Sequence, residues 1–116
     1  METTDAPGKV IIAPEVLITI ARLSTLSVSG VARMAAVPGG MDRYFKRGYA
    51  DGVRIQVANH TIAADLYIVV RGDANVHTVS AAVQQEVARA FVEMVGMETQ
   101  TVNVHVEDVA FVGEEQ

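Results

Sequence analysis

A histidine and a carboxylate at alternate positions of one predicted strand are the first residues whose spacing permits chemistry. His105 and Glu107 flank Val106, so an extended chain places an imidazole and a carboxylate on one face, as a general acid/base pair requires. The same H-x-E spacing opens the zinc deaminase motif, which also needs a Pro-Cys-x-x-Cys partner, and the chain has no cysteine. The alternative interpretation, which we favour, places both side chains on the outer face of an alternating strand.

The remaining polar residues do not form a recognisable reaction centre or metal set. His60 falls in a predicted turn, His77 in the first turn of a predicted helix and His105 in a strand, so their spacing indicates no metal site. No phosphate-binding loop or nucleophile elbow is present. Asp65 fits a solvated or cross-strand-paired residue better than a catalytic one. The sequence therefore predicts no catalytic residue, no metal and no cofactor, and the protein is not expected to be an enzyme.

One segment collects basic and aromatic residues, between Arg43 and Tyr49. Arg, Tyr and Phe are enriched at protein interfaces, which favours a docking surface here. The predicted partner surface comprises Arg43, Tyr44, Lys46, Arg47, Tyr49 and, on the outer face of the following hairpin, Tyr67. A solvated connection whose aromatic residues cover a core edge is the alternative. Nucleic-acid binding through the same cations would be weak, because the net charge is −5.

The elements that position these residues centre on a hairpin over residues 53–70. Apolar residues alternate on both sides of a polar turn in VRIQV-ANHT-IAADLYIVV, which predicts two paired strands. The other predicted elements are a strand at 9–13, a helix at 14–28, a strand at 31–37, a helix at 76–95 capped by Asn75, and a strand at 101–106 with a bulge near 107–108. This order, β-α-β-β-β-α-β, predicts an α+β fold with a two-layer architecture. Its sheet is mixed or mainly antiparallel, with two helices on one face.

The helices are predicted to cover the sheet with faces at 3.6-residue spacing. For the first helix this face comprises Val16, Leu17, Ile20, Leu23, Ser24 and Ser27, whereas Ile18 and Leu26 fall on the other side. For the second it comprises Val76, Val79, Val83, Val87, Ala90, Phe91 and Met94. A chain of 116 residues is one domain by size, predicted over 9–112 with tails at 1–8 and 113–116.

Several strings in this order resemble the alkaline-shock (general stress, envelope stress response) proteins of Gram-positive bacteria and their relatives. The strings are Glu15-Val16-Leu17, Gly30-Val31, Asp65-Leu66-Tyr67-Ile68-Val69-Val70, Val83-Gln84 and Val102-Asn103-Val104-His105-Val106, within a match over roughly residues 8–111. The resemblance implies a cytosolic, self-associating protein that is not an enzyme. Some relatives are held at the membrane by a separate anchor protein, and others are tied to control of fatty-acid synthesis.

These observations lead to a non-catalytic scaffold that binds itself or a partner as the first functional hypothesis. Recruitment to the inner face of the membrane by an anchor protein belongs to it, with a cytoplasmic location and a homo-oligomeric state expected. The alternative is a regulatory protein that binds an enzyme of fatty-acid synthesis. The amino-terminal sequence METTDAPG lacks the basic and apolar regions of a signal peptide, and no apolar run is long enough to span a bilayer.

Overall fold

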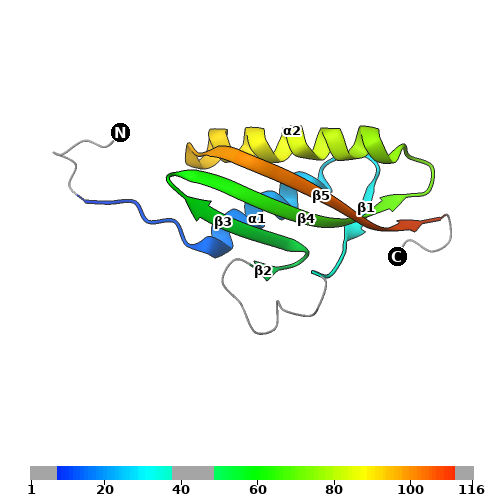
Figure 1. The fold of residues 1–116 in the computed structure, drawn as a ribbon, viewed down its shortest axis with the longest axis horizontal. Coiled ribbons are helices and arrows are strands. Elements are labelled where there is room, and N and C mark those ends of the chain that lie inside the picture. Colours follow the sequence, from blue (N-terminus) through cyan, green and yellow to red (C-terminus); the bar gives the residue numbers. More distant parts are fainter. Residues whose placement is uncertain (1–7, 38–48, 112–116) are drawn as a thin grey trace.

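The structure, a computed structural model, describes residues 8–37 and 49–111, which form two helices and one sheet (Figure 1). The helices are α1 (Pro14–Leu26) and α2 (Val76–Val95). The strands are β1 (Val31–Met34), β2 (Tyr49–Ala50), β3 (Val53–Ala58), β4 (Thr61–Arg71) and β5 (Glu98–Ala110).

Strand β4 is the centre of the sheet, because three strands pair with it. Along one edge, β3 pairs antiparallel with residues 61–66 and β1 pairs antiparallel with residues 68–70. Along the other edge, β5 runs parallel to the whole of β4. Strand β2 adds two residues to the outer edge of β3. The sheet is therefore mixed, and the predicted α+β class is confirmed.

Both helices pack on one face of this sheet and share a single core with it (Figure 1). Alternate residues of β4 point into that core, and Leu66 at its centre is completely buried. Helix α2 contributes a buried stripe whose members are Val79, Val83, Val87 and Phe91. Neither α1 nor α2 lies on the other face of the sheet, which turns toward the viewer in Figure 1.

Local signals explain the elements whose positions were predicted correctly. Asn59 and His60 form the two-residue hairpin turn with φ angles of 53° and 62°, as a type I′ turn requires. Helix α2 has the predicted bounds because Asn75 caps its first turn, accepting a 2.9 Å hydrogen bond from the Thr78 amide, and Gly96 ends it in the left-handed conformation. The predicted bulge is also confirmed, because the register of β4 with β5 shifts at Glu107.

The predicted strand at residues 9–13 is wrong. These residues have no regular secondary structure, and we call residues 8–13 the arm. The side chains of Val10 and Ile11 are 90% and 84% exposed. The β-branched residues of this segment favour a strand. A strand also needs the edge of a neighbouring strand for its hydrogen bonds, and no described strand pairs with the arm. The strand predicted at 31–37 is likewise shorter, ending at Met34.

Helix α1 is rotated relative to the predicted orientation. Ile18, predicted to lie outside the core, is buried, whereas Val16 and Leu23 are 44% and 56% exposed. The buried residues of the helix are Leu17, Ile18, Ile20, Ala21 and Thr25. The helix contacts α2 as well as the sheet, so the buried arc faces both neighbours. Because α1 is apolar on more than one side, sequence periodicity could not identify that arc.

Candidate functional site

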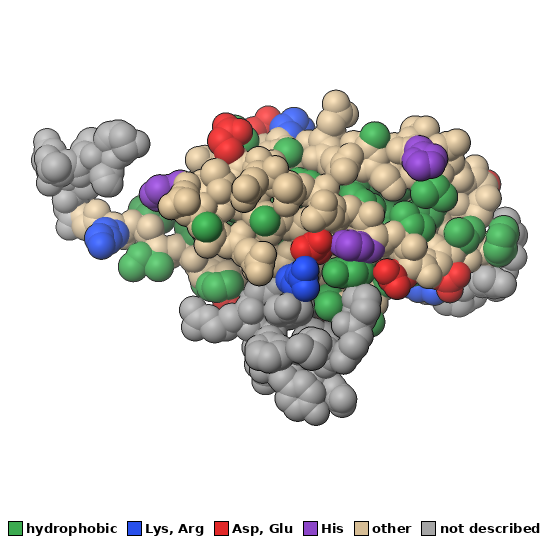
Figure 2. Space-filling model, in the orientation of Figure 1, with side chains coloured by type: hydrophobic (Ala, Val, Ile, Leu, Met, Phe, Trp, Pro, Cys, Tyr) green, Lys and Arg blue, Asp and Glu red, His purple; other side chains and the backbone are tan. Residues whose placement is uncertain are grey.

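A cluster of polar side chains lies on the helix-free face of the sheet, centred on Asp65. Strand register brings it together, since Asp65 of β4 is opposite Arg54 of β3 and Asn103 of β5. His105 lies two residues further along β5, on the same face. Figure 2 shows acidic, basic and histidine side chains side by side near the middle of this face. We call these residues, together with Tyr67, the Asp65 cluster.

The Asp65 carboxylate accepts hydrogen bonds from three neighbouring side chains. His105 Nε2 donates to Oδ1 at 2.9 Å, and Asn103 Nδ2 donates to the same oxygen at 3.2 Å. The Arg54 guanidinium donates to Oδ2 from two nitrogens, at 3.2 and 3.4 Å. Only 14% of the Asp65 side chain is exposed, so these contacts replace most of its hydration.

The surroundings of Asp65 keep it ionised. Burial raises its pKa, but hydrogen bonds from His105 and Asn103 and the charge of Arg54 together outweigh that effect, so the net pKa lies below the ordinary value of 3.8. An ionised carboxylate can only accept hydrogen bonds, which assigns the proton in the shared bond to His105 Nε2. The geometry therefore orients the imidazole ring of His105.

An aromatic contact fixes the other side of this imidazole. The rings of His105 and Tyr67 are stacked, with centroids 4.3 Å apart and planes 10° from parallel. Tyr67 is only 6% exposed, although it belongs to the face without helices. The cluster therefore ties β3, β4 and β5 together through one carboxylate and one ring stack.

The predictions made for individual polar residues fare differently in the structure. The cross-strand role predicted for Asp65 is confirmed. The carboxylate that contacts His105 belongs to Asp65, and the bulge at Glu107 interrupts the alternation on which a His105–Glu107 pair depended. Arg54 and Asn103 were not predicted as partners of Asp65. The two-residue turn could have identified Arg54, because it fixes the register that sets Arg54 opposite Asp65.

The predicted partner surface falls mostly outside the described residues. Arg43, Tyr44, Lys46 and Arg47 lie in the segment 38–48, and the backbone of Tyr49 pairs with Arg54 in β2. The backbone of Tyr67 binds described residues on either side of this segment in the sequence. Its carbonyl accepts from the Ala35 amide at 2.7 Å, and its amide donates to the Gly52 carbonyl at 2.8 Å. The surface remains a prediction.

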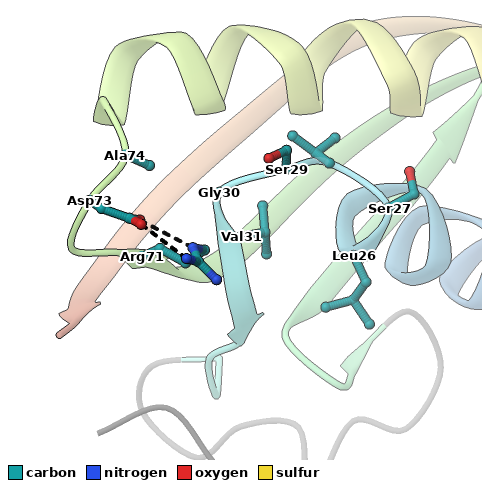
Figure 3. Close-up of a pocket in the computed structure, with 9 residues that line it drawn as sticks. Leu26, Ser27, Ser29, Gly30, Val31, Arg71, Asp73 and Ala74 are labelled. Atoms are coloured by element: carbon teal, nitrogen blue, oxygen red, sulfur yellow. Dashed lines mark hydrogen bonds and ion pairs between the residues drawn. The ribbon is translucent and has the colours of Figure 1, made fainter. Parts of the chain in front are cut away.

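A cavity of about 580 Å³ lies between the end of α1 and the start of α2 (Figure 3). Its lining residues are Leu26, Ser27, Val28, Ser29, Gly30, Val31, Arg71, Asp73 and Ala74. Arg71 donates two hydrogen bonds, of 3.0 and 3.1 Å, to the carboxylate of Asp73 at its edge. The two side chains are 44% and 61% exposed, so this ion pair lies at the surface.

A larger apolar groove of about 940 Å³ runs beneath the arm, and we call it the arm groove. Its lining residues are Val10, Ile11, Ile12, Ala13, Pro14, Glu15, Leu17, Ile55, Val57, His60, Val95, Gly96 and Met97. Three of the large apolar side chains that line it, those of Val10, Ile11 and Val57, are at least half exposed. Apolar area of this kind is typical of contact surfaces.

Within residues 8–37 and 49–111, no group of three His, Asp or Glu side chains is placed to hold a metal ion. In the same part of the chain, neither helix has the length and apolar character needed to cross a membrane.

Comparison with solved structures places the fold beside the MamM CTD. One such structure has a TM-score of 0.55 and 20% identity, covering 81% of this chain and 94% of the other. A variant described as a zinc form has the same TM-score and 18% identity, covering 81% of this chain and 84% of the other. At this level of identity the likeness shows the fold alone.

Sequence relatives cover almost the whole chain. The uncharacterized protein YqhY of Bacillus subtilis (strain 168) is 32% identical over 106 residues, covering 90% of this chain and 78% of the relative. The uncharacterized protein Spy1535 of Streptococcus pyogenes serotype M6 is 31% identical over 108 residues, covering 92% and 83%. A family model described as having a cell envelope-related function matches residues 2–111. The chain therefore belongs to the alkaline shock protein 23 family, as the strings in its strands and helices indicated.

Proposed function

We propose that this protein is a non-catalytic scaffold that self-associates and acts at the cell envelope through protein–protein contacts. The family's cell envelope-related function supports the setting. Recruitment by a separate membrane-anchored partner is part of the proposal.

The observation that carries the proposal is exposed apolar area outside the core. Val10 and Ile11 of the arm are almost fully exposed, next to a half-exposed Val57 in the arm groove. Helix α1 adds Val16, Leu23 and Leu26, which follow one another at seven- and three-residue spacing along its outer side and are 39–56% exposed. Exposed apolar area of this kind is typical of contact sites on soluble proteins.

The chemistry of the polar sites supports a scaffold rather than an enzyme. Hydrogen bonds and the charge of Arg54 hold the pKa of the Asp65 carboxyl below its ordinary value. This carboxylate is therefore a poor proton donor or acceptor near neutral pH. The Arg71–Asp73 ion pair also forms within this chain. The contacts of Asp65 hold three strands together, whereas the Arg71–Asp73 pair, whose side chains are 44% and 61% exposed, contributes little to stability.

Light scattering of the purified chain over a concentration series tests self-association. We expect a mass of at least twice the monomer at high concentration, falling as the sample is diluted. A strict monomer throughout would refute self-association.

Affinity purification from host cells, followed by mass spectrometry, tests the partner. Recovery of envelope or membrane proteins is the expected result. Recovery of enzymes of fatty-acid synthesis instead would favour a regulatory role.

A further inference from the structure

The arm has the composition of a strand but lacks a strand's partner. Lys9–Ile12 is one basic residue followed by three β-branched residues, and Pro14 ends the segment by opening α1. No backbone hydrogen bond joins residues 9–12 to other described residues. Figure 1 shows the arm running outward past the hairpin end of β3 and β4. Two large apolar side chains are thereby left in solvent.

The described structure also contains an unpaired strand edge of matching length. Strand β2 covers only Val53 and Arg54, so the outer edge of Ile55–Ala58 has no strand beside it among the described residues. That stretch has four residues, as Lys9–Ile12 does, and it carries no charged side chain. Ile55 and Val57 line the arm groove. An uncharged open edge is a ready template for another strand.

The other long edge of the sheet is protected against such pairing. Along β5, the acidic residues Glu98, Glu107 and Asp108 are exposed, and the register is interrupted at two places. Charges and bulges on an edge strand oppose edge-to-edge association. An added strand is therefore favoured at β3 rather than at β5.

We propose that two copies of this chain exchange arms, residues 9–12 of each pairing as an edge strand with Ile55–Ala58 of the other. This inference rests on the proposed self-association and specifies its interface. Each chain supplies one arm and one open edge of equal length, so a reciprocal exchange satisfies both and closes a two-fold dimer. A different partner protein on the β3 edge would leave the arm exposed.

Side-chain direction selects the register of the exchange. Ile12 already packs against the core, and Val10 shares its side of an extended arm. On β3, Val53, Ile55 and Val57 point to the helix side, where the first two are buried. An antiparallel register that sets Ile12 opposite Ile55 and Val10 opposite Val57 places all four side chains on that side. The exchanged arm would thus cover the arm groove of the other copy.

Because the chain has no cysteine, single introduced thiols can test this register. Val10→Cys and Val57→Cys are prepared as separate proteins, mixed at a concentration at which the unaltered chain is dimeric, and oxidised. We expect a disulfide-linked heterodimer on non-reducing gels and by mass spectrometry. Mixing Val10→Cys with Ala81→Cys, an exposed position on α2, provides the matched control, for which we expect background cross-linking only.

A proline at Val10 tests the backbone pairing, because in this register the amides of Val10 and Ile12 face the open edge of β3 and proline cannot donate an edge-strand hydrogen bond. Val10 is 90% exposed, so Val10→Pro leaves the core intact while the dimer is lost at that concentration. Val10→Thr keeps the amide and the β-branch, and it should retain the dimer.

The outcomes separate this inference from the proposed function. A dimer that persists in Val10→Pro, or a mixture of Val10→Cys and Val57→Cys that cross-links no better than the control, overturns arm exchange while self-association stands. In that case the exposed side of α1 becomes the interface to test, with Leu23→Lys. A further protein carries both Val10→Cys and Val57→Cys in one chain. An intramolecular disulfide in this double variant, without a disulfide-linked heterodimer from the mixture of single variants, would show that the arm closes on its own β3. A monomeric unaltered chain overturns both.

Discussion

Two leucine-to-alanine substitutions, Leu66→Ala and Leu23→Ala, make the same chemical change in opposite environments. Leu66 is completely buried at the centre of β4, between Val53 of β3 and Val104 of β5. Leu23 is 56% exposed on the outer side of α1. The pair therefore measures burial with the change in side chain held constant.

The expected magnitudes follow from the atoms removed. At Leu66, three lost carbons cost about 0.8 kcal/mol each in transfer free energy. The cavity that they leave adds to this loss, because the surrounding strands and α2 collapse only partly, so the total should be about 3–5 kcal/mol. At Leu23 the remaining chain loses little burial, and alanine has the higher helix propensity, so the change should stay within about 0.5 kcal/mol.

Urea denaturation followed by far-ultraviolet circular dichroism measures both free energies of unfolding, provided that the slope with denaturant is unchanged. Samples are kept at a concentration at which the unaltered chain is monomeric, so that an interface does not enter the comparison. A loss above about 2 kcal/mol for Leu23→Ala, or below about 1 kcal/mol for Leu66→Ala, would show that the buried faces are assigned wrongly.

Three further substitutions test the turns and the Asp65 cluster. Gly30→Ala should destabilise the fold by about 2 kcal/mol or more in thermal unfolding, because Gly30 has a φ of +102° and an added Cβ would meet Val79 Cγ2 at 2.5 Å. Gly96→Ala should cost less, because Gly96 also has a positive φ but nothing lies within 4 Å of the added Cβ. Equal losses of stability would contradict the packing argument. Asn75→Ala should cost about 1 kcal/mol in chemical denaturation through loss of the cap on α2, and a change near zero would mean that water replaces the cap. Because folding lowers the pKa of Asp65, its contribution to stability is present above pH 3.8, its ordinary pKa, and is lost as the pH falls through the lower folded-state pKa. Asp65→Asn should therefore reduce the loss of unfolding free energy at acid pH, measured by denaturation over a pH series. An unchanged dependence on pH would exclude Asp65 as the source of that loss.

The elements that could be predicted from sequence are those whose local signals agree with one another. In α2, a single apolar stripe, the Asn75 cap and the terminating Gly96 all indicate the same bounds, and the structure has them. In the hairpin, alternation fixed the faces and the turn residues fixed the register, so Leu66 was assigned correctly to the core. Two of the family strings, at residues 65–70 and 83–84, lie in the hairpin and in α2.

The Asp65 cluster shows why a site is harder to predict than an element. Alternation placed Asp65 and His105 on outer strand faces, but the sequence did not show that β4 and β5 are parallel neighbours. The distance of 2.9 Å between these side chains follows from a crossover through α2, with 40 residues separating them along the chain. Arg54 was within reach of sequence reasoning through the hairpin register. Asn103 was not, because its partner depends on that same crossover.

By itself, the sequence determined the hairpin, the second helix and, apart from the two-residue strand β2, the order of the elements that follow the arm. The hairpin and the second helix rest on contacts between residues that are near in the chain. Only the tertiary structure decided which side of α1 is buried and that the arm forms no strand. Both depend on what lies next to the segment: α1 has apolar residues on two sides and buries those that meet α2 and the sheet. The arm has the residues of a strand, but no described strand offers it a paired edge. Local pattern specifies what a segment can form, and its neighbours decide what it does form.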